Sequence, residues 1–214
     1  MIIGILGGTG KEGSGLSLRW ARAGHTVVIG SRDEGRARAK GVELTEKSGG
    51  TVLGKSNADA ATQGDIVVVA VPFAVHRSLL EQLRPLFASK VVIDTVVPLD
   101  FKAKHSYAPP PEGSAAEEAE AILGDGAHVV AALHQIAAHE LASLEHAIEA
   151  DGFYCGNDPT AKARVHDLVA ALGVRPIDAG PLKNAPLLES MTPLLIELNK
   201  QHKVKSAGIR LTGI

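Results

Sequence analysis

The chain has 214 residues, of which 45% are hydrophobic, 21% charged and 3% aromatic, with a formal net charge of −2. This balance is typical of one globular α/β domain with or without a small appendage, and it argues against a nucleic-acid partner. The longest apolar run, 66–75, is about ten residues long and contains Pro72, too short for a membrane span. No secretory signal precedes the first apolar run, and one cysteine, Cys155, excludes an internal disulfide and a Cys-rich metal site. We expect a cytoplasmic protein without a metal.

Short apolar runs alternate with longer helical patterns along the chain. The expected strands are residues 1–6, 25–29, 51–54, 66–71, 91–95, 128–132, 153–155 and 174–178. The expected helices are 13–23, 34–48, 57–61, 75–87, 114–123, 159–172 and 185–202, with a helix or loop over 137–149. This alternation predicts an α/β fold with a Rossmann-type, doubly wound and mostly parallel sheet. We place a domain boundary near residue 156, although the last part could equally extend the same sheet.

The first expected strand is followed by a glycine-rich turn. Gly8, Gly10 and Gly13 form a G-x-G-x-x-G pattern between this strand and the first helix. In order, these glycines are expected to permit a tight turn, a close approach of a pyrophosphate, and close packing of helix on strand. The helix that starts near Lys11 would offer free N–H groups to phosphates. Glycine turns also serve purely structural loops, but a second strand about 20 residues later supplies the context of a dinucleotide site.

The end of the second expected strand indicates which dinucleotide binds. NAD-binding proteins usually place an acidic residue there, whereas this chain has Ser31 and Arg32, with Arg36 in the next helix. A hydroxyl and guanidinium groups suit a 2′-phosphate, so NADP(H) is favoured, although Arg36 could equally be a solvated helix charge. Thr9 could add a hydroxyl contact. Asp33 lies beyond the strand and is expected to cap the following helix.

Three further turns follow expected parallel strands, where a doubly wound sheet binds its ligand. Their candidate residues are Val71, Pro72, Phe73 and His76, then Val97 and Pro98, then His134, Ile136 and Ala137. The apolar members are expected to pack against ribose and nicotinamide. His76 suits either a phosphate or ribose contact or a helix cap. His134 suits either proton transfer or simple positioning, since hydride transfer between cofactors mainly needs orientation and apolar walls.

Several motifs, taken in order, resemble the deazaflavin-dependent NADP oxidoreductases, which pass a hydride between coenzyme F420 and NADP. They are LGGTG at 6–10, GSR at 30–32, VVP at 96–98, SAAE at 114–117, ALH at 132–134, RPIDAGPL at 175–182 and ESMTPL at 189–194. The resemblance covers nearly the whole chain. Two positions depart from it: Ala137 stands where the family commonly has proline, and Phe73 where a tryptophan is usual. Both positions border the hydride acceptor rather than NADP.

The resemblance also implies roles for individual residues. The 2′-phosphate would be held by Thr9, Ser31, Arg32 and Arg36, and the pyrophosphate by backbone groups of Gly10, Lys11 and Glu12. The nicotinamide channel would be lined by Val71 and Pro72, and the deazaflavin cleft by Val97, Pro98, His134, Ile136 and Ala137. Residues 1–156 would form the NADP-binding domain, and residues 157–214 would complete the acceptor cleft and contribute to a homodimer.

Two alternatives to an F420-dependent enzyme stay open from the sequence. One is an NADPH-dependent reductase of another acceptor, namely a flavin, a ferric compound or a small imine or carbonyl compound. The other is a non-catalytic module that senses NADP(H).

Overall fold

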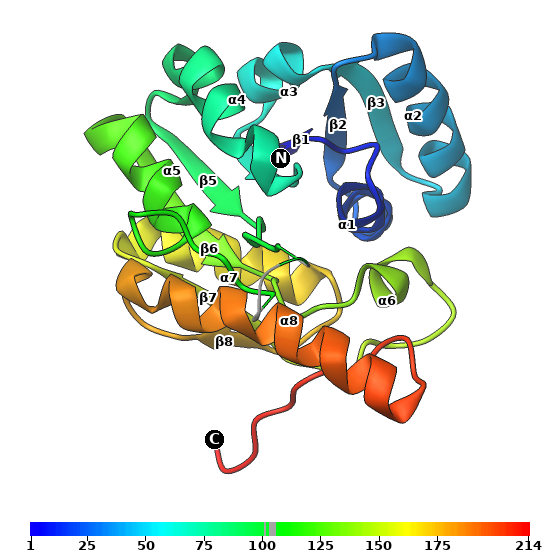
Figure 1. Ribbon diagram of the computed structural model, residues 1–214. Helices are drawn as coiled ribbons and strands as arrows, with labels where there is room; N and C mark the ends of the chain where they lie inside the picture. Colours follow the sequence, from blue (N-terminus) through cyan, green and yellow to red (C-terminus); the bar gives the residue numbers. More distant parts are fainter. Residues whose placement is uncertain (101, 103–105) are drawn as a thin grey trace.

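The computed structural model describes residues 1–100, 102 and 106–214. Its eight strands are β1 (Ile2–Leu6), β2 (Thr26–Ser31), β3 (Thr51–Ser56), β4 (Ile66–Val69), β5 (Lys90–Asp94), β6 (Ala127–Ala132), β7 (Gly152–Gly156) and β8 (Pro176–Asp178). They form one sheet in the order β3-β2-β1-β4-β5-β6-β7-β8 (Figure 1). Neighbouring strands are parallel except for β6 and β7. The first six strands thus have the doubly wound order, which confirms the predicted Rossmann-type fold.

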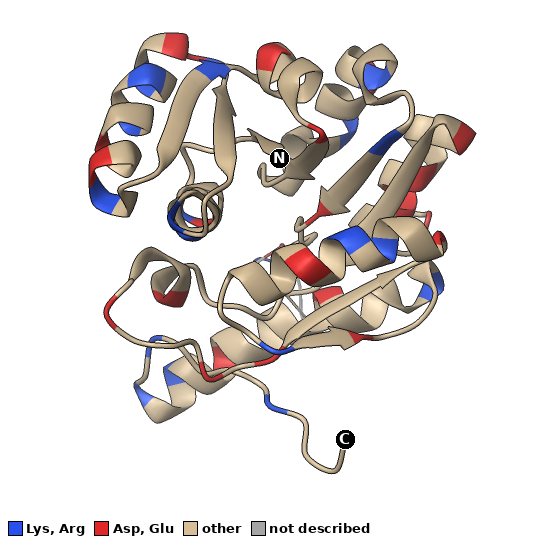
Figure 2. Cartoon of the chain, turned by 180° about the vertical axis from the view of Figure 1, so that it is seen from behind, with Lys and Arg blue, Asp and Glu red and all other residues tan. Residues whose placement is uncertain are grey.

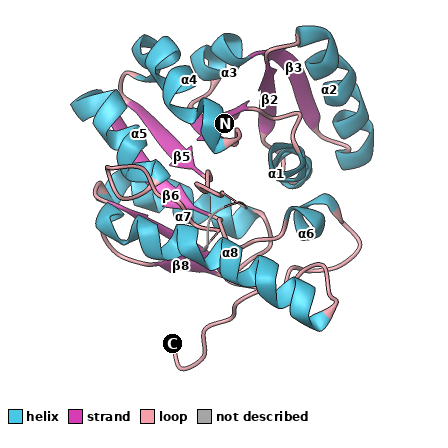
Figure 3. Cartoon of the chain, viewed as in Figure 1, coloured by secondary structure: helices cyan, strands magenta, loops and turns pink. Residues whose placement is uncertain are grey.

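Helices cover both faces of this sheet (Figure 3). They are α1 (Lys11–Arg22), α2 (Glu34–Ser48), α3 (Asn57–Gln63), α4 (His76–Leu83), α5 (Ala115–Leu123), α6 (Ala138–Ala142), α7 (Pro159–Ala171) and α8 (Ala185–His202). The core on one face is built with α1, α2, α6 and α7, and the core on the other face with α3, α4, α5 and α8. Within β4, Ile66 and Val68 belong to the first core and Val67 and Val69 to the second, so the whole strand must be apolar.

Charged side chains lie mainly on the helices. Figure 2 shows lysine, arginine and acidic residues along α2, whereas the strands are almost free of charge. Four helices begin with a side chain that caps their free N–H groups: Asp33 caps α2, Ser56 α3, Ser114 α5 and Asp158 α7. The expected cap by Asp33 is confirmed, since its carboxylate accepts a hydrogen bond from the N–H of Arg36. The exception that matters for function is α1, whose N-cap is Gly10 with no side-chain cap.

The sheet continues past residue 156. Strand β7 ends at Gly156, and β8 pairs with it in parallel through Phe153 and Ile177. The last helix then returns toward the middle of the sheet, where the Thr192 hydroxyl donates a 2.6 Å hydrogen bond to the carbonyl of His134. Residues 157–214 therefore extend the same sheet and carry α8 to the site. Their behaviour as a separate domain stays a prediction.

Candidate active site

A cavity of about 530 Å³ lies at the carboxyl ends of β1, β4, β5 and β6. The glycine turn, the turns after these strands and the inner side of α8 form its walls. It brings together these predicted residues: Gly10, Lys11, Glu12, Val71, Pro72, Val97, His134, Ile136 and Ala137. Its size is that of a site for a small molecule, and the carboxyl ends of the strands are where this fold binds ligands.

The glycine turn differs in one detail from the expected division of roles. Gly7, not Gly8, has the left-handed backbone, with φ of 73°. A Cβ on Gly8 would lie 2.6 Å from the Cβ of Ile29, so Gly8 is needed for close contact with β2. A Cβ on Gly13 would lie 2.7 Å from the Cα of Gly8, as expected for tight packing of α1 on the turn. The first N–H groups of the uncapped α1 can therefore approach an anion closely.

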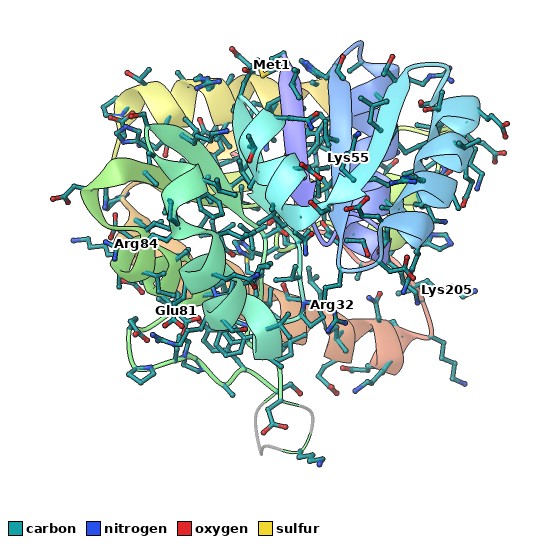
Figure 4. The ribbon with its side chains drawn as sticks, turned by 90° about the horizontal axis from the view of Figure 1, so that it is seen from above. Met1, Arg32, Lys55, Glu81, Arg84 and Lys205 are labelled. Atoms are coloured by element: carbon teal, nitrogen blue, oxygen red, sulfur yellow. The ribbon has the colours of Figure 1, made fainter. Side chains whose placement is uncertain are left out.

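The residues expected at the 2′-phosphate lie outside the cavity, around the end of β2. Ser31 is the last residue of β2, and Arg32 and Arg36 are exposed beyond it (Figure 4). Within the described part of the chain, the Arg32 guanidinium forms no ion pair. Thr9 lines a separate hollow of about 410 Å³ beside α1, α2 and α6. The structure thus leaves Arg32 available to an exposed phosphate, without bringing Thr9 into the same cavity as His134.

The turn after β6 holds His134 in an unusual environment. Leu133 precedes it with φ of 69°, a strained conformation for a residue other than glycine, and such strain is often found at functional sites. His134 is 6% exposed, and neither of its ring nitrogens has a hydrogen-bond partner among the described residues. Burial lowers the pKa of His134 to about 4, although the charge of Asp94 opposes the shift. A neutral imidazole therefore lines the cavity with one donor and one acceptor to offer.

Two further polar side chains of the cavity wall also lack a partner among the described residues. Gln135 is 2% exposed; its Nε2 donates to the carbonyl of Asp151 at 2.7 Å, which leaves Oε1 without a donor. Glu12 has a solvent-shielded Oε1 with no partner, and burial raises the pKa of this carboxyl to about 8. Gln135 was not among the predicted site residues, and its position next to His134 is the one sequence signal that points to it.

His76, Phe73 and Pro98 do not line the cavity. The expected phosphate or ribose contact of His76 needs correction, because its Nε2 lies 2.8 Å from Asp94 and its Nδ1 2.8 Å from Glu118. It is the first residue of α4 rather than the N-cap of that helix, and its backbone N–H caps the preceding 3₁₀ turn Phe73–Val75. Phe73 stacks on His76 with ring centroids 6.0 Å apart.

The side chains of His76, Asp94 and Glu118 form a buried group behind the cavity wall. His76 and Asp94 are 0% exposed and Glu118 is 3% exposed. Asp94 also accepts a 2.9 Å hydrogen bond from the backbone N–H of Val96, which lies on the cavity wall. The trio of His76, Asp94 and Glu118 thus fixes the turn after β5.

Comparisons with known proteins show which family the chain resembles. Residues 2–98 match the family described as NADP oxidoreductase, coenzyme F420-dependent. The F420-dependent NADP reductase of Methanothermobacter thermautotrophicus is 38% identical, with 100% of this chain and 96% of that protein aligned. The chain belongs to this family.

Other members of the family align over similar lengths. The F420-dependent NADP reductase of Methanocaldococcus jannaschii is 37% identical over 100% of this chain and 99% of its own length. A crystal structure of a protein assigned as an F420-dependent NADP reductase from Arthrobacter sp. FB24 superposes with a TM-score of 0.83. It is 27% identical and covers 99% of both chains. The family likeness therefore includes the residues that follow residue 98.

Across residues 1–100, 102 and 106–214, no cluster of His, Cys, Asp and Glu side chains could hold a metal ion. None of the helices described in these ranges is both long and apolar enough to cross a membrane.

Proposed function

We propose that this protein transfers a hydride between NADP(H) and the deazaflavin coenzyme F420. The observation that carries the proposal is the cavity beside the glycine turn, with apolar walls and the unpartnered nitrogens of His134. Its family relatives are named F420-dependent NADP reductases, and they align over the full chain. Unpartnered polar atoms in a mainly apolar cavity fit flat ring systems that carry a few polar edge groups.

NADP(H) would span two parts of the chain. The N–H groups of the uncapped α1 would bind the pyrophosphate, as helix N-termini bind anions. The exposed guanidinium of Arg32, with Ser31 and Arg36 beside it, would bind the 2′-phosphate through charge-assisted hydrogen bonds. The nicotinamide half would enter the cavity at Val71 and Pro72.

The acceptor ring would lie in the same cavity, against His134, Ile136 and Ala137. When bound, the two cofactors supply the hydride-donating and hydride-accepting carbons. The protein's part would be to hold both rings in contact and exclude water, a role for which the apolar side chains of Val97, Ile136 and Leu195 in the cavity wall are suited. Because His134 is neutral, it can orient a ring by one donated and one accepted hydrogen bond without adding charge.

The test is NADPH oxidation by the purified protein with F420, FMN or FAD as the acceptor, followed by the loss of nicotinamide absorbance. We expect rapid turnover with F420 and much slower turnover when NADH replaces NADPH. Turnover with FMN, ferric or imine compounds but not with F420 would instead show a reductase of another acceptor. Tight NADPH binding without any turnover would favour a sensing module.

We further propose that the protein is a homodimer to which residues 157–214 contribute. Support comes from α8, where the side chains of Leu187 and Leu194 are 62% and 55% exposed, which is unusual for large apolar residues on one helix. Light scattering during size-exclusion chromatography measures the mass, and a monomeric mass would refute the proposed homodimer. The cytoplasmic location stays a prediction.

A further inference from the structure

Glu12 is an acidic residue in the wall of a cavity that is otherwise mainly apolar. It is the second residue of α1, directly after the glycine turn that would hold the pyrophosphate. Its side chain lines the same cavity as Val97 and His134, whereas Arg32 does not line this cavity. A dinucleotide held at Arg32 and at the glycine turn would continue into this cavity, so the half of the cofactor that meets Glu12 would be the nicotinamide half.

The carboxyl group of Glu12 has no internal partner among the described residues. Its Oε1 is shielded from solvent and unpaired. The charged or titratable side chains on the other walls are Lys11 on α1, His134 after β6 and Lys205 after α8, which Figure 4 labels. None of them forms an ion pair with Glu12, and Asp94 lies behind the wall, bound to His76. A partner for Oε1 would therefore come from whatever fills the cavity.

We propose that the Glu12 carboxyl group faces the bound nicotinamide and, when ionised, makes the protein prefer NADP⁺ over NADPH. This inference rests on the proposed function. The oxidised nicotinamide ring carries a positive charge and the reduced ring carries none, while the rest of the two molecules is identical. A carboxylate with an oxygen shielded from water attracts the oxidised ring more strongly than it would in water.

The preference should depend on pH in a defined direction. Burial raises the pKa of Glu12 to about 8, so the group is mostly neutral at pH 7 in the empty protein and becomes ionised above pH 8. By linkage, NADP⁺ must raise the acid dissociation constant of Glu12, and so lower its pKa, by the same factor by which ionisation of Glu12 tightens NADP⁺ binding. Ionised Glu12 would also favour hydride departure from NADPH, because positive charge develops on the ring during transfer.

The experiment measures the dissociation constants of NADP⁺ and NADPH by calorimetry across this pH range. For the wild type, we expect the ratio of the NADP⁺ constant to the NADPH constant to fall about tenfold or more between about pH 6 and about pH 9.5. Titration of the 2′-phosphate cancels in this ratio because both cofactors carry it. For Glu12→Gln, which keeps size and hydrogen bonding but cannot ionise, the ratio should change less than about twofold. The control Glu46→Gln removes an exposed carboxylate on α2 and should behave as the wild type.

A second readout uses the wild type alone and does not depend on the variant folding. Binding of NADP⁺ at pH 8 should release more protons than binding of NADPH, which calorimetry in two buffers of different ionisation enthalpy counts. A constant ratio in the wild type, an unchanged pH slope in Glu12→Gln or equal proton release would overturn the inference while leaving hydride transfer intact. If neither nucleotide binds, the proposed function fails and the inference fails with it.

Discussion

Replacing His76 by glutamine should destabilise the protein by about 3–5 kcal/mol at neutral pH, the cost of breaking a buried ion pair. In the wild type the His76 ring lies 2.8 Å from both Asp94 and Glu118, with almost no exposure of the three side chains. Glutamine has a similar volume and can make hydrogen bonds, but it carries no charge. The two carboxylates would then face each other in the core, relieved on one side by the bond from Arg77 to Glu118.

The pKa of His76 supports this magnitude. Burial lowers this pKa, but the charges and hydrogen bonds of Asp94 and Glu118 outweigh burial and raise it from 6.5 to about 9. At about 1.36 kcal/mol per pH unit, the rise corresponds to about 3 kcal/mol in favour of the imidazolium. Because the folded-state pKa lies above the unfolded value, this stabilisation is complete below pH 6.5 and is lost as the pH rises through about 9.

Urea denaturation followed by the fluorescence of Trp20, the single tryptophan and 0% exposed, measures both effects. The free-energy difference between wild type and His76→Gln should be largest below pH 6.5 and shrink toward about pH 9. Glu12 also titrates in this range but is common to both proteins, so the difference isolates His76. The matched control His128→Gln, at a side chain 45% exposed, should cost less than about 1 kcal/mol. A loss below about 1 kcal/mol for His76→Gln, or a difference independent of pH, would refute the ionic trio.

Three further substitutions test other parts of the molecule. Arg32→Ala should weaken NADPH binding by about 1–3 kcal/mol and leave NADH binding unchanged in parallel titrations, and equal weakening would make Arg32 structural. Ala137→Trp should fill the acceptor side of the cavity, so that F420-dependent turnover falls while NADPH still binds; unchanged turnover would contradict the placement of the acceptor. Arg19 is buried and donates hydrogen bonds to backbone carbonyls that include those of Leu141 and Ser143. Arg19→Met should therefore lower the free energy of unfolding by at least about 2 kcal/mol. Limited proteolysis should then cut the segment around residue 143 faster, and wild-type resistance would show that other contacts hold it.

The sequence predicted a helix accurately where residues at its two ends, such as an N-capping side chain and a C-terminal glycine, fix where it begins and ends. The predicted helix 34–48 coincides with α2, because Asp33 caps its start and Gly49 ends it with φ of 71°. The predicted helix 75–87 is shorter in the structure, where α4 covers His76–Leu83 and a 3₁₀ turn follows over Arg84–Phe87. Pro85 explains the difference, since it has no N–H for an α-helical bond. The antiparallel pairing of β6 with β7 had no local signal, because it depends on how the chain returns to the sheet.

Contacts between distant residues set the parts of the site that the sequence did not predict. His76 meets Asp94 18 residues away and Glu118 42 residues away, so neither spacing forms a motif. Glu189 is similar: it is 0% exposed and accepts bonds from the N–H groups of Ala115 and Ala116, more than 70 residues earlier. The turns after the strands could be predicted because the fold fixes where strands end, whereas the side chains that support these turns come from helices whose packing was unknown.

For Glu12, the position in the helix and the burial of the side chain have opposite effects on the pKa. An acidic residue in the first turn of a helix normally stays ionised, because the helix dipole stabilises it by about 0.3–1 kcal/mol. The rise of its pKa from 4.5 to about 8 corresponds to about 5 kcal/mol against the ionised form, so burial outweighs the dipole. Because Glu12 is neutral, the free N–H groups at the start of α1 are available to the pyrophosphate. An ionised Glu12 carboxylate would compete with the pyrophosphate for this positive end of the helix. At pH 7, a cation that enters the cavity would therefore favour the ionised form of Glu12, and the oxidised nicotinamide is the cation of the proposed reaction.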